Sequence, residues 1–293
     1  MTEIDATSWQ PRTEVSTEYV DPGRVAALAA LFDDGLPTPQ PGDPLPPLWH
    51  WVALPHWASS GQLGPDGHPR RGSFLPPVAL PRRMFAGGRV RFPGTLRVGE
   101  TVRREADVLS VTEKNGRSGT LVIVEVQTRL HTDGGTLALD ERQNIVYREA
   151  AAPSATAPTA PPEHVPGQPL SRLSESEWEL RTDPTLLMRF SAATANAHRI
   201  HYDWPYTTGV EGYPGLVVHG PLQALALAET HRLASGAPVT ALEHRGNAPL
   251  FCGQPARLRS SLRADGNLLE LFASKADSAK AGAVLDITTG SAR

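Results

Sequence analysis

The residues best suited to chemistry lie in the run NAHRIHYD, from Asn196 to Asp203, and in the His219-Gly220 pair that follows a glycine-rich stretch. A histidine exchanges protons near neutral pH, so His201 is a candidate general base or acid. Gly220 opens a long apolar segment, and the first N–H groups of a helix are unpaired and carry partial positive charge. Such groups can polarise a carbonyl oxygen. The pattern predicts proton transfer beside a polarised carbonyl.

This region resembles the active loop of the MaoC-type hydratases of the hot-dog superfamily. The I-H-Y-D string of that loop matches residues 200–203, and its downstream H-G step into the central helix matches YPGLVVHGPLQALAL at 213–227. Asn196 stands where the wider family has its catalytic Asp. The form N-x-H-R-I-H-Y-D is closer to a subgroup, the hydroxyacyl-thioester dehydratases type 2 and the bacterial mesaconyl-C4-CoA and itaconyl-CoA hydratases. The strings at 42–51, 63–72 and 80–90 resemble the bacterial members.

The resemblance implies a hydro-lyase of the EC 4.2.1 type, which adds or removes water across the α,β-double bond of an acyl thioester. The acyl group would be carried on CoA or on an acyl carrier protein, with no metal and no further cofactor. His201 would activate water and return the α-proton, and Asn196 would hold the water through its amide. A backbone N–H near Gly220 would bind the thioester oxygen. Since Asn cannot exchange a proton at neutral pH, His201 would carry more of the work.

Other residues of the loop have a functional and a structural interpretation. His198 either orients the catalytic histidine or packs in the core. Arg199 could contact a substrate carboxylate or a CoA phosphate. We expect His219 to brace the loop by hydrogen bonding and Asp203 to cap a local turn. For Asn196 the alternative is a turn-stabilising role, and for Gly220 it is simple helix-start geometry.

Two features of the first half are more ambiguous. The spacing His68-Gly72-Pro77 resembles the H-x-x-x-G-x-x-x-x-P string of synthase dehydratase domains, but it lies in a proline-rich loop with no helix after it. We therefore set it aside. Four arginines are candidates for the phosphates of CoA, with a solvated loop as the alternative: Arg70, Arg71, Arg82 and Arg83.

The elements around these residues are strands and a few helices. Residues 21–35 predict a helix capped by Asp21 and ended by Gly35, and LWHWVALPHW predicts a short packed helix. Four strand-like runs follow between residues 88 and 148, separated by turn residues. The second half predicts helices from Asp183 and over 220–235, then four more strand-like runs from 240 to the end.

The two halves share a plan, because in both a strand ends, a short apolar bend reaches a glycine (Gly99 or Gly253), and a long strand begins. We expect an α+β double hot-dog, in which two antiparallel sheets each wrap a helix. The expected parts are a degenerate hot-dog domain at 1–150 with a shortened central helix, an Ala/Pro-rich linker at 151–169, and a MaoC-like domain at 170–293 that carries the site.

Composition narrows the class further. The net charge is -3 with no long run of like charges, which disfavours nucleic-acid and membrane-surface partners. The lone Cys252 excludes an intrachain disulfide. The polar start is unlike a signal peptide, so we expect a cytoplasmic protein. A homodimer is also expected. Two other functions stay open: a hot-dog acyl-CoA thioesterase, and a non-catalytic acyl-thioester-binding protein.

Overall fold

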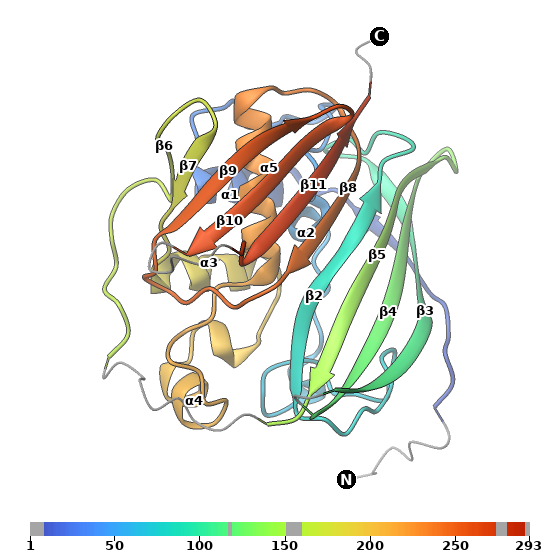
Figure 1. Cartoon of the computed structure of the whole chain (residues 1–293). Helices are drawn as coiled ribbons and strands as arrows, with labels where there is room; N and C mark the ends of the chain where they lie inside the picture. The colour runs from blue at the N-terminus through green and yellow to red at the C-terminus, as the bar shows by residue number, and fades with distance from the viewer. Residues whose placement is uncertain (1–8, 117–118, 151–159, 274–279, 291–293) are drawn as a thin grey trace.

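The structure is a computed structural model and describes residues 9–116, 119–150, 160–273 and 280–290. Its described strands form one antiparallel sheet in the order β1-β3-β4-β5-β2-β8-β11-β10-β9-β7-β6 (Figure 1). The strands of the first half are β1 (Glu14–Tyr19), β2 (Arg82–Arg91), β3 (Thr101–Gly116), β4 (Gly119–Thr132) and β5 (Leu137–Arg148). Those of the second half are β6 (Leu170–Arg172), β7 (Glu177–Leu180), β8 (Val239–Gly246), β9 (Ala256–Arg263), β10 (Gly266–Ala273) and β11 (Ala283–Thr289).

The helices lie mainly on the concave side of this sheet. They are α1 (Pro22–Phe32), α2 (His50–Ala53), α3 (Pro184–Ala193), α4 (Trp204–Gly209) and α5 (Gly220–Ala234), with 3-10 turns η1 (Ser60–Gln62) and η2 (Arg199–His201). None of the helices in the described ranges is long and apolar enough to cross a bilayer.

The two expected sheets are joined along β2 and β8, which pair from Gly87 opposite Arg245 to Arg91 opposite Ala241. α5 is the central helix of the second half. It packs against β9, β10 and β11, and also against β2 of the first half. Every residue from Leu222 to His231 is buried, so this part of the helix is enclosed by protein on all sides. The first half has the short α2 in the corresponding place, as the sequence predicted.

The predicted helix at 21–35 ends earlier than expected. Asp21 caps α1 by accepting a hydrogen bond from Gly23 N (2.7 Å), as predicted, but the helix stops at Phe32. Asp33 then takes the left-handed conformation (φ 47°), so the expected stop at Gly35 was wrong. The strands β1, β6 and β7 and the helix α4 were not predicted. Residues 151–159 of the predicted linker lie outside the described residues, and the domain boundaries stay a prediction.

The internal repeat extends beyond the bend that the sequence shows. α1 and α3 each begin with an Asp cap followed by Pro, and each is followed by a left-handed residue, Asp33 (φ 47°) or Ala195 (φ 54°). The next side chain closes the same turn in both copies. Asp34 Oδ1 accepts from Leu36 N (2.9 Å), and Asn196 Oδ1 accepts from His198 N (3.0 Å). Asp34 is therefore the first-half counterpart of Asn196.

A second correspondence sets the helix starts side by side. Leu45 N donates to Leu96 O and Val218 N donates to Leu250 O, each at 2.8 Å. Two residues beyond these donors the first half has Pro47 and the second half has Gly220. Proline has no backbone N–H, so the first half lacks the donor that Gly220 supplies.

Candidate active site

His201 ends the turn η2 and is buried, with 6% of its surface exposed. Its Nδ1 lies 2.6 Å from Val217 O. Because a carbonyl oxygen can only accept, Nδ1 carries the proton and the lone pair is left on Nε2. Burial, and then the neighbouring His219 and His198, hold the pKa of His201 well below its usual 6.5. The residue is thus a neutral imidazole with a free basic nitrogen.

His219 stacks on His201 with 3.6 Å between ring centroids and 17° between ring planes. It is fully buried, and its Nε2 is hydrogen-bonded to Ser191 Oγ at 2.8 Å. Burial, assisted by His198, lowers the pKa of His219 to about 3. Both stacked rings are therefore uncharged at neutral pH. This geometry agrees with the prediction that His219 braces the loop, and Ser191 is a partner that the sequence did not indicate.

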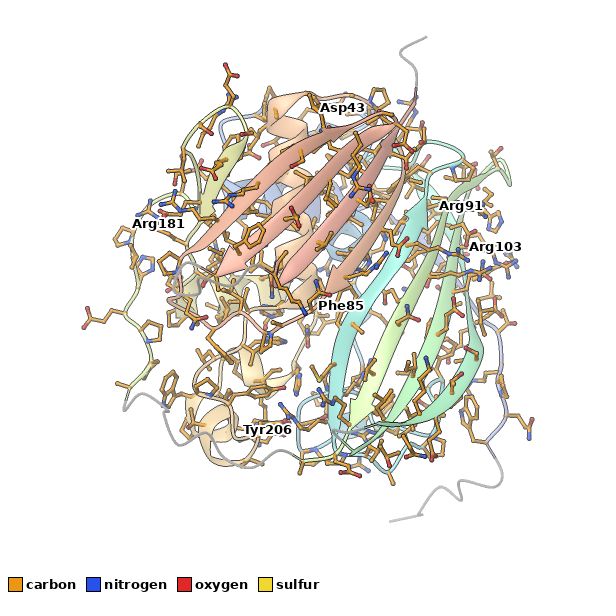
Figure 2. The ribbon with its side chains drawn as sticks, in the orientation of Figure 1. Asp43, Phe85, Arg91, Arg103, Arg181 and Tyr206 are labelled. Carbon is orange, nitrogen blue, oxygen red and sulfur yellow. The ribbon has the colours of Figure 1, made fainter. Side chains whose placement is uncertain are left out.

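Gly220 is the first residue of α5, directly after His219. A Cβ at this position would lie 2.7 Å from Cδ1 of Phe85, which belongs to β2 of the first half. Figure 2 shows Phe85 at the boundary between the two halves of the sheet. Its ring stacks on that of His244. Glycine is thus required for close packing here, and the helix start stays open to a ligand oxygen. Its oxygen-binding role stays a prediction.

Asn196 is held by the turn described above. Its backbone N donates to Ser191 O (2.9 Å), and its side-chain oxygen accepts from His198 N (3.0 Å). The side-chain oxygen of Asn196 therefore has the turn-stabilising role that was the structural alternative. Only the amide donors are left to contact a water or a substrate, which remains a prediction.

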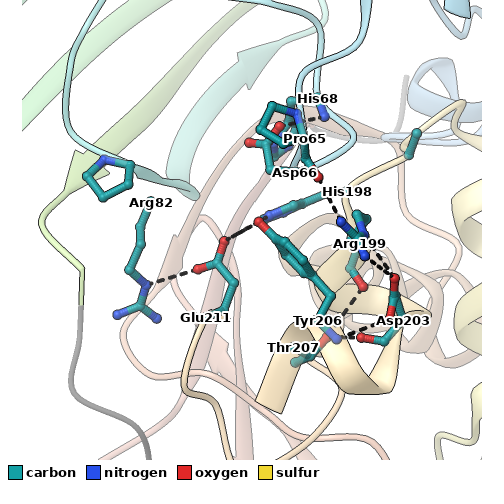
Figure 3. A network of polar contacts seen from close by, with 12 residues as sticks. Pro65, Asp66, His68, Arg82, His198, Arg199, Asp203, Tyr206, Thr207 and Glu211 are labelled. Atoms are coloured by element: carbon teal, nitrogen blue, oxygen red, sulfur yellow. Dashed lines mark hydrogen bonds and ion pairs between the residues drawn. The ribbon is translucent and has the colours of Figure 1, made fainter. Parts of the chain in front are cut away.

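His198 is buried and lies within a polar network that connects the two halves (Figure 3). Its Nε2 is 3.8 Å from Glu211 Oε1, which accepts from Tyr206 Oη at 3.1 Å. Arg82 Nε lies 3.3 Å from the other oxygen of Glu211. Burial raises the pKa of Glu211, but these partners outweigh it and lower the pKa below the usual value. Glu211 is therefore an anion, and it holds the His198 ring in place from the side of Nε2.

Arg199 joins the active loop to the loop at residues 63–69. Its guanidinium bonds to Asp203 Oδ2 (2.7 and 2.9 Å) and donates to Pro65 O (3.0 Å), and its backbone N donates to Asp66 O (2.9 Å). It also stacks over the Tyr206 ring at 4.1 Å. Contact with a substrate carboxylate or a CoA phosphate stays a prediction for Arg199, whose guanidinium is engaged within the protein. Asp203 caps α4, as expected.

His68, which we had set aside, lies in the site. Its ring centroid is 4.0 Å from that of His198, and its Nδ1 is 3.1 Å from Asp66 Oδ2. Burial, followed by the nearby Arg83, lowers the pKa of His68 to about 3, and His68 holds the pKa of Asp66 at about 2. A Cβ on Gly67 would overlap the carbonyl oxygen of Ala197, so this loop packs directly on the active loop. The H-x-x-x-G-x-x-x-x-P spacing was the feature of the sequence that could have indicated His68 as a site residue.

The four arginines proposed for CoA phosphates have different surroundings. Arg71 donates to the carbonyls of Val78, Leu80 and Pro81, Arg82 binds Glu211, and Arg70 Nε donates to Leu63 O at 3.3 Å. In the described ranges Arg83 has no hydrogen bond or ion pair.

Asp66, His68 and His198 offer atoms within 4.8 Å of one another, a spacing that could hold a metal ion.

Comparison with known proteins agrees with the fold and shows the family. The family model for hydroxyacyl-thioester dehydratase type 2 matches residues 48–252. The chain is 43% identical over 284 residues to a mesaconyl-C(4)-CoA hydratase of Chloroflexus aurantiacus, covering 96% of this chain and 97% of that protein. Crystallised HtdX of Mycobacterium tuberculosis superposes with a TM-score of 0.65 at 18% identity over 95% of this chain and all of HtdX. Another protein of that organism, described as a double hot-dog, superposes with a TM-score of 0.54 at 17% identity, over 96% of this chain and 95% of that protein.

The fold and the site define a double hot-dog hydro-lyase. The chain belongs to the hydroxyacyl-thioester dehydratase type 2 family, and its activity is that of a hydratase or dehydratase of acyl thioesters.

Proposed function

We propose that His201 is the single acid–base group of a hydratase whose substrate is an enoyl-CoA of the mesaconyl-C4 type. The observation that carries the assignment is the free Nε2 of a neutral, buried His201 beside the start of α5. The proposed acyl group follows the name of the relative that is 43% identical over nearly the whole chain.

The chemistry follows from the orientation of these groups. The thioester oxygen accepts a hydrogen bond from Gly220 N–H, which draws electrons from the double bond. His201 Nε2 takes a proton from water as the water oxygen bonds to Cβ, and the same proton or its equivalent is returned to Cα. Each acid–base or oxyanion interaction of this kind contributes roughly 10²–10³-fold.

The test is turnover of mesaconyl-C4-CoA, itaconyl-CoA and crotonyl-CoA, followed by mass spectrometry for the gain of water. His201→Ala should lower kcat/KM at least about 10³-fold, while the exposed His56→Gln should match the wild type. Undiminished hydration by the His201 variant would contradict the assignment. Release of free CoA would indicate the thioesterase alternative, and tight binding without turnover would indicate a binding protein.

The reaction as written needs no metal and no cofactor besides the thioester carrier. The carboxyl of Asp66 already accepts from His68, and the positive charge of Arg83 opposes a cation at that cluster. Dialysis against a chelator should leave kcat/KM unchanged, and a loss restored by a divalent ion would contradict this part. A cytoplasmic location and a homodimer belong to the same proposal, and cell fractionation and sedimentation test them.

A further inference from the structure

Arg83 lies on β2 two residues before Phe85, the residue that touches the start of α5. Side chains two apart on a strand share a face and are about 7 Å apart. Arg83 and Phe85 therefore lie on the same face of β2, and Phe85 contacts the start of α5. Arg83 is also close enough to His68 to be the second largest influence on the pKa of that histidine.

Arg83 differs from the arginines around it because its guanidinium forms no hydrogen bond or ion pair within the described residues. Arg71 and Arg82 are hydrogen-bonded or ion-paired, whereas Arg83 has no acceptor within the described part of the chain. The surrounding protein desolvates it and lowers its pKa, yet a guanidinium stays protonated in proteins. Arg83 is partly buried, so a guanidinium without a hydrogen-bond partner in the described residues is still available to bind the anion of a ligand.

Tyr147 faces Arg83 directly across β2 and β5. Its side chain is fully buried, and its hydroxyl has no hydrogen-bond partner among the residues that the structure describes. Burial raises the pKa of Tyr147, so the hydroxyl keeps its proton and remains a donor. The guanidinium of Arg71 lies 4.9 Å from the centre of this ring and adds positive charge.

The nearest carboxylate does not satisfy these donors. Asp66 influences both Arg83 and Tyr147, but its two oxygens accept from the backbone N (3.0 Å) and Nδ1 (3.1 Å) of His68. The wall beside the catalytic histidines therefore offers a guanidinium and a buried hydroxyl with no acceptor. A carboxylate matches both groups.

We propose that Arg83 and Tyr147 bind a free carboxylate on the acyl group, at the end opposite the thioester. The pocket then selects enoyl thioesters that carry a carboxylate on Cβ over those that carry a methyl group there. This inference rests on the proposed function, and it makes Arg83 a specificity residue for the acyl group, not a contact for the phosphates of CoA.

The decisive comparison uses two substrates of the same skeleton. Mesaconyl-C4-CoA and 3-methylcrotonyl-CoA differ only in a carboxylate that is replaced by a methyl group. Arg83→Gln should lower kcat/KM for mesaconyl-C4-CoA about 100-fold and for 3-methylcrotonyl-CoA less than threefold, because a site built around a polar group depends on that group. Tyr147→Phe should cost about tenfold on the carboxylated substrate alone, and Arg83→Lys should restore part of the loss. The exposed Arg89→Gln on the same strand is the matched control.

An equal loss on both substrates would overturn the proposal, because it would indicate a structural role or a contact with CoA. Full activity of Arg83→Gln on mesaconyl-C4-CoA would overturn it too. If the wild type hydrates neither substrate, the proposed function fails separately. Calorimetric binding then decides the subsite: affinity for mesaconyl-C4-CoA must exceed that for 3-methylcrotonyl-CoA, and Arg83→Gln must remove the difference.

Discussion

The carbonyl of Val217 determines which nitrogen of His201 is basic. It holds the proton on Nδ1, and the stacked ring of His219 excludes water from one face. Three causes disfavour the charged imidazolium of His201 and lower its pKa: burial, His219 and His198. The residue is a base that stays deprotonated in mild acid.

This lowered pKa predicts the pH dependence of the reaction. The active form of a general base is the neutral one, and a pKa below 6.5 keeps His201 neutral as the pH falls. We expect kcat/KM for the preferred thioester to stay flat down to about pH 5.5. Initial rates between pH 5 and 8 measure this, with re-assay at pH 7 to confirm that the enzyme survives. An acid limb centred near 6.5 would show that the base is exposed to water.

The sequence predicted those site residues that form one local string. His201, Asn196, His198 and His219-Gly220 follow each other closely, so their order alone carried the signal. His68 and Ser191 were missed for a physical reason. His68 is 130 residues from His198, and only the packing of the loop at 63–69 on the active loop brings their rings together. The carboxylate that faces His198, Glu211, likewise has no local pattern around it.

At the scale of elements, the repeat shows what the first half lost. It keeps the Asp-Pro helix start, the left-handed residue and the turn that Asp34 closes. It has Pro47 where the second half has Gly220, and the active loop is replaced by the short segment 35–43. The first half thus has the same helix start and turn, but no counterpart of His201 or of the Gly220 N–H.

The contact between Gly220 and Phe85 gives a test of the helix start. Gly220→Ala should lower stability by about 1–3 kcal/mol through overpacking and kcat/KM by about 10- to 100-fold through displacement of the N–H. Phe85→Leu in the same chain should recover part of both losses. Chemical denaturation and steady-state rates measure them.

Gly61→Ala is the control, because nothing lies within 4 Å of a Cβ there. If Gly220→Ala kept full activity and stability, close packing would not be the reason for glycine.

Elements with strong periodicity or clear turns were predictable, and short ones were not. α3, α5 and the long strands β3 to β5 matched their predicted runs. β1 has the sequence EVSTEY with one face barely buried, and β7 has four residues, so neither shows an alternation long enough to recognise. Their place at the sheet depends on β3 and β9, which are distant in sequence.

At the scale of the molecule, the buried histidines govern acid stability. His68, His219 and His244 have pKa values of about 3, 3 and 4, and that of His201 is also lowered. When the chain unfolds, each regains a pKa near 6.5 and takes up a proton below that pH. The part of the stability that depends on these histidines is therefore full above pH 6.5 and falls as the pH drops. Glu229, whose pKa burial raises to about 8, acts in the opposite sense between 4.5 and 8.

The net uptake near pH 5 is about three protons, so the free energy of unfolding should fall by about 4 kcal/mol per pH unit there. Urea denaturation at several pH values between 4.5 and 6.5 measures the slope. His244→Gln should reduce the slope by about one proton, since its Nε2 is buried without a partner. The exposed His56→Gln should leave it unchanged, and an equal slope in both variants would contradict the assignment.

Both copies of the repeat lie on one polypeptide, and the pairing of β2 with β8 joins their strands into one sheet. In a symmetric pair of identical chains, every substitution occurs twice. A change such as Gly220→Pro would then delete the donor from both sites at once. Covalent linkage removes that constraint, because one copy can lose its donor and contribute Phe85, Arg83 and His68 to its neighbour's site. Because the two halves are joined in one chain, the ancestral symmetry between the copies could be lost and specificity for the acyl group could develop.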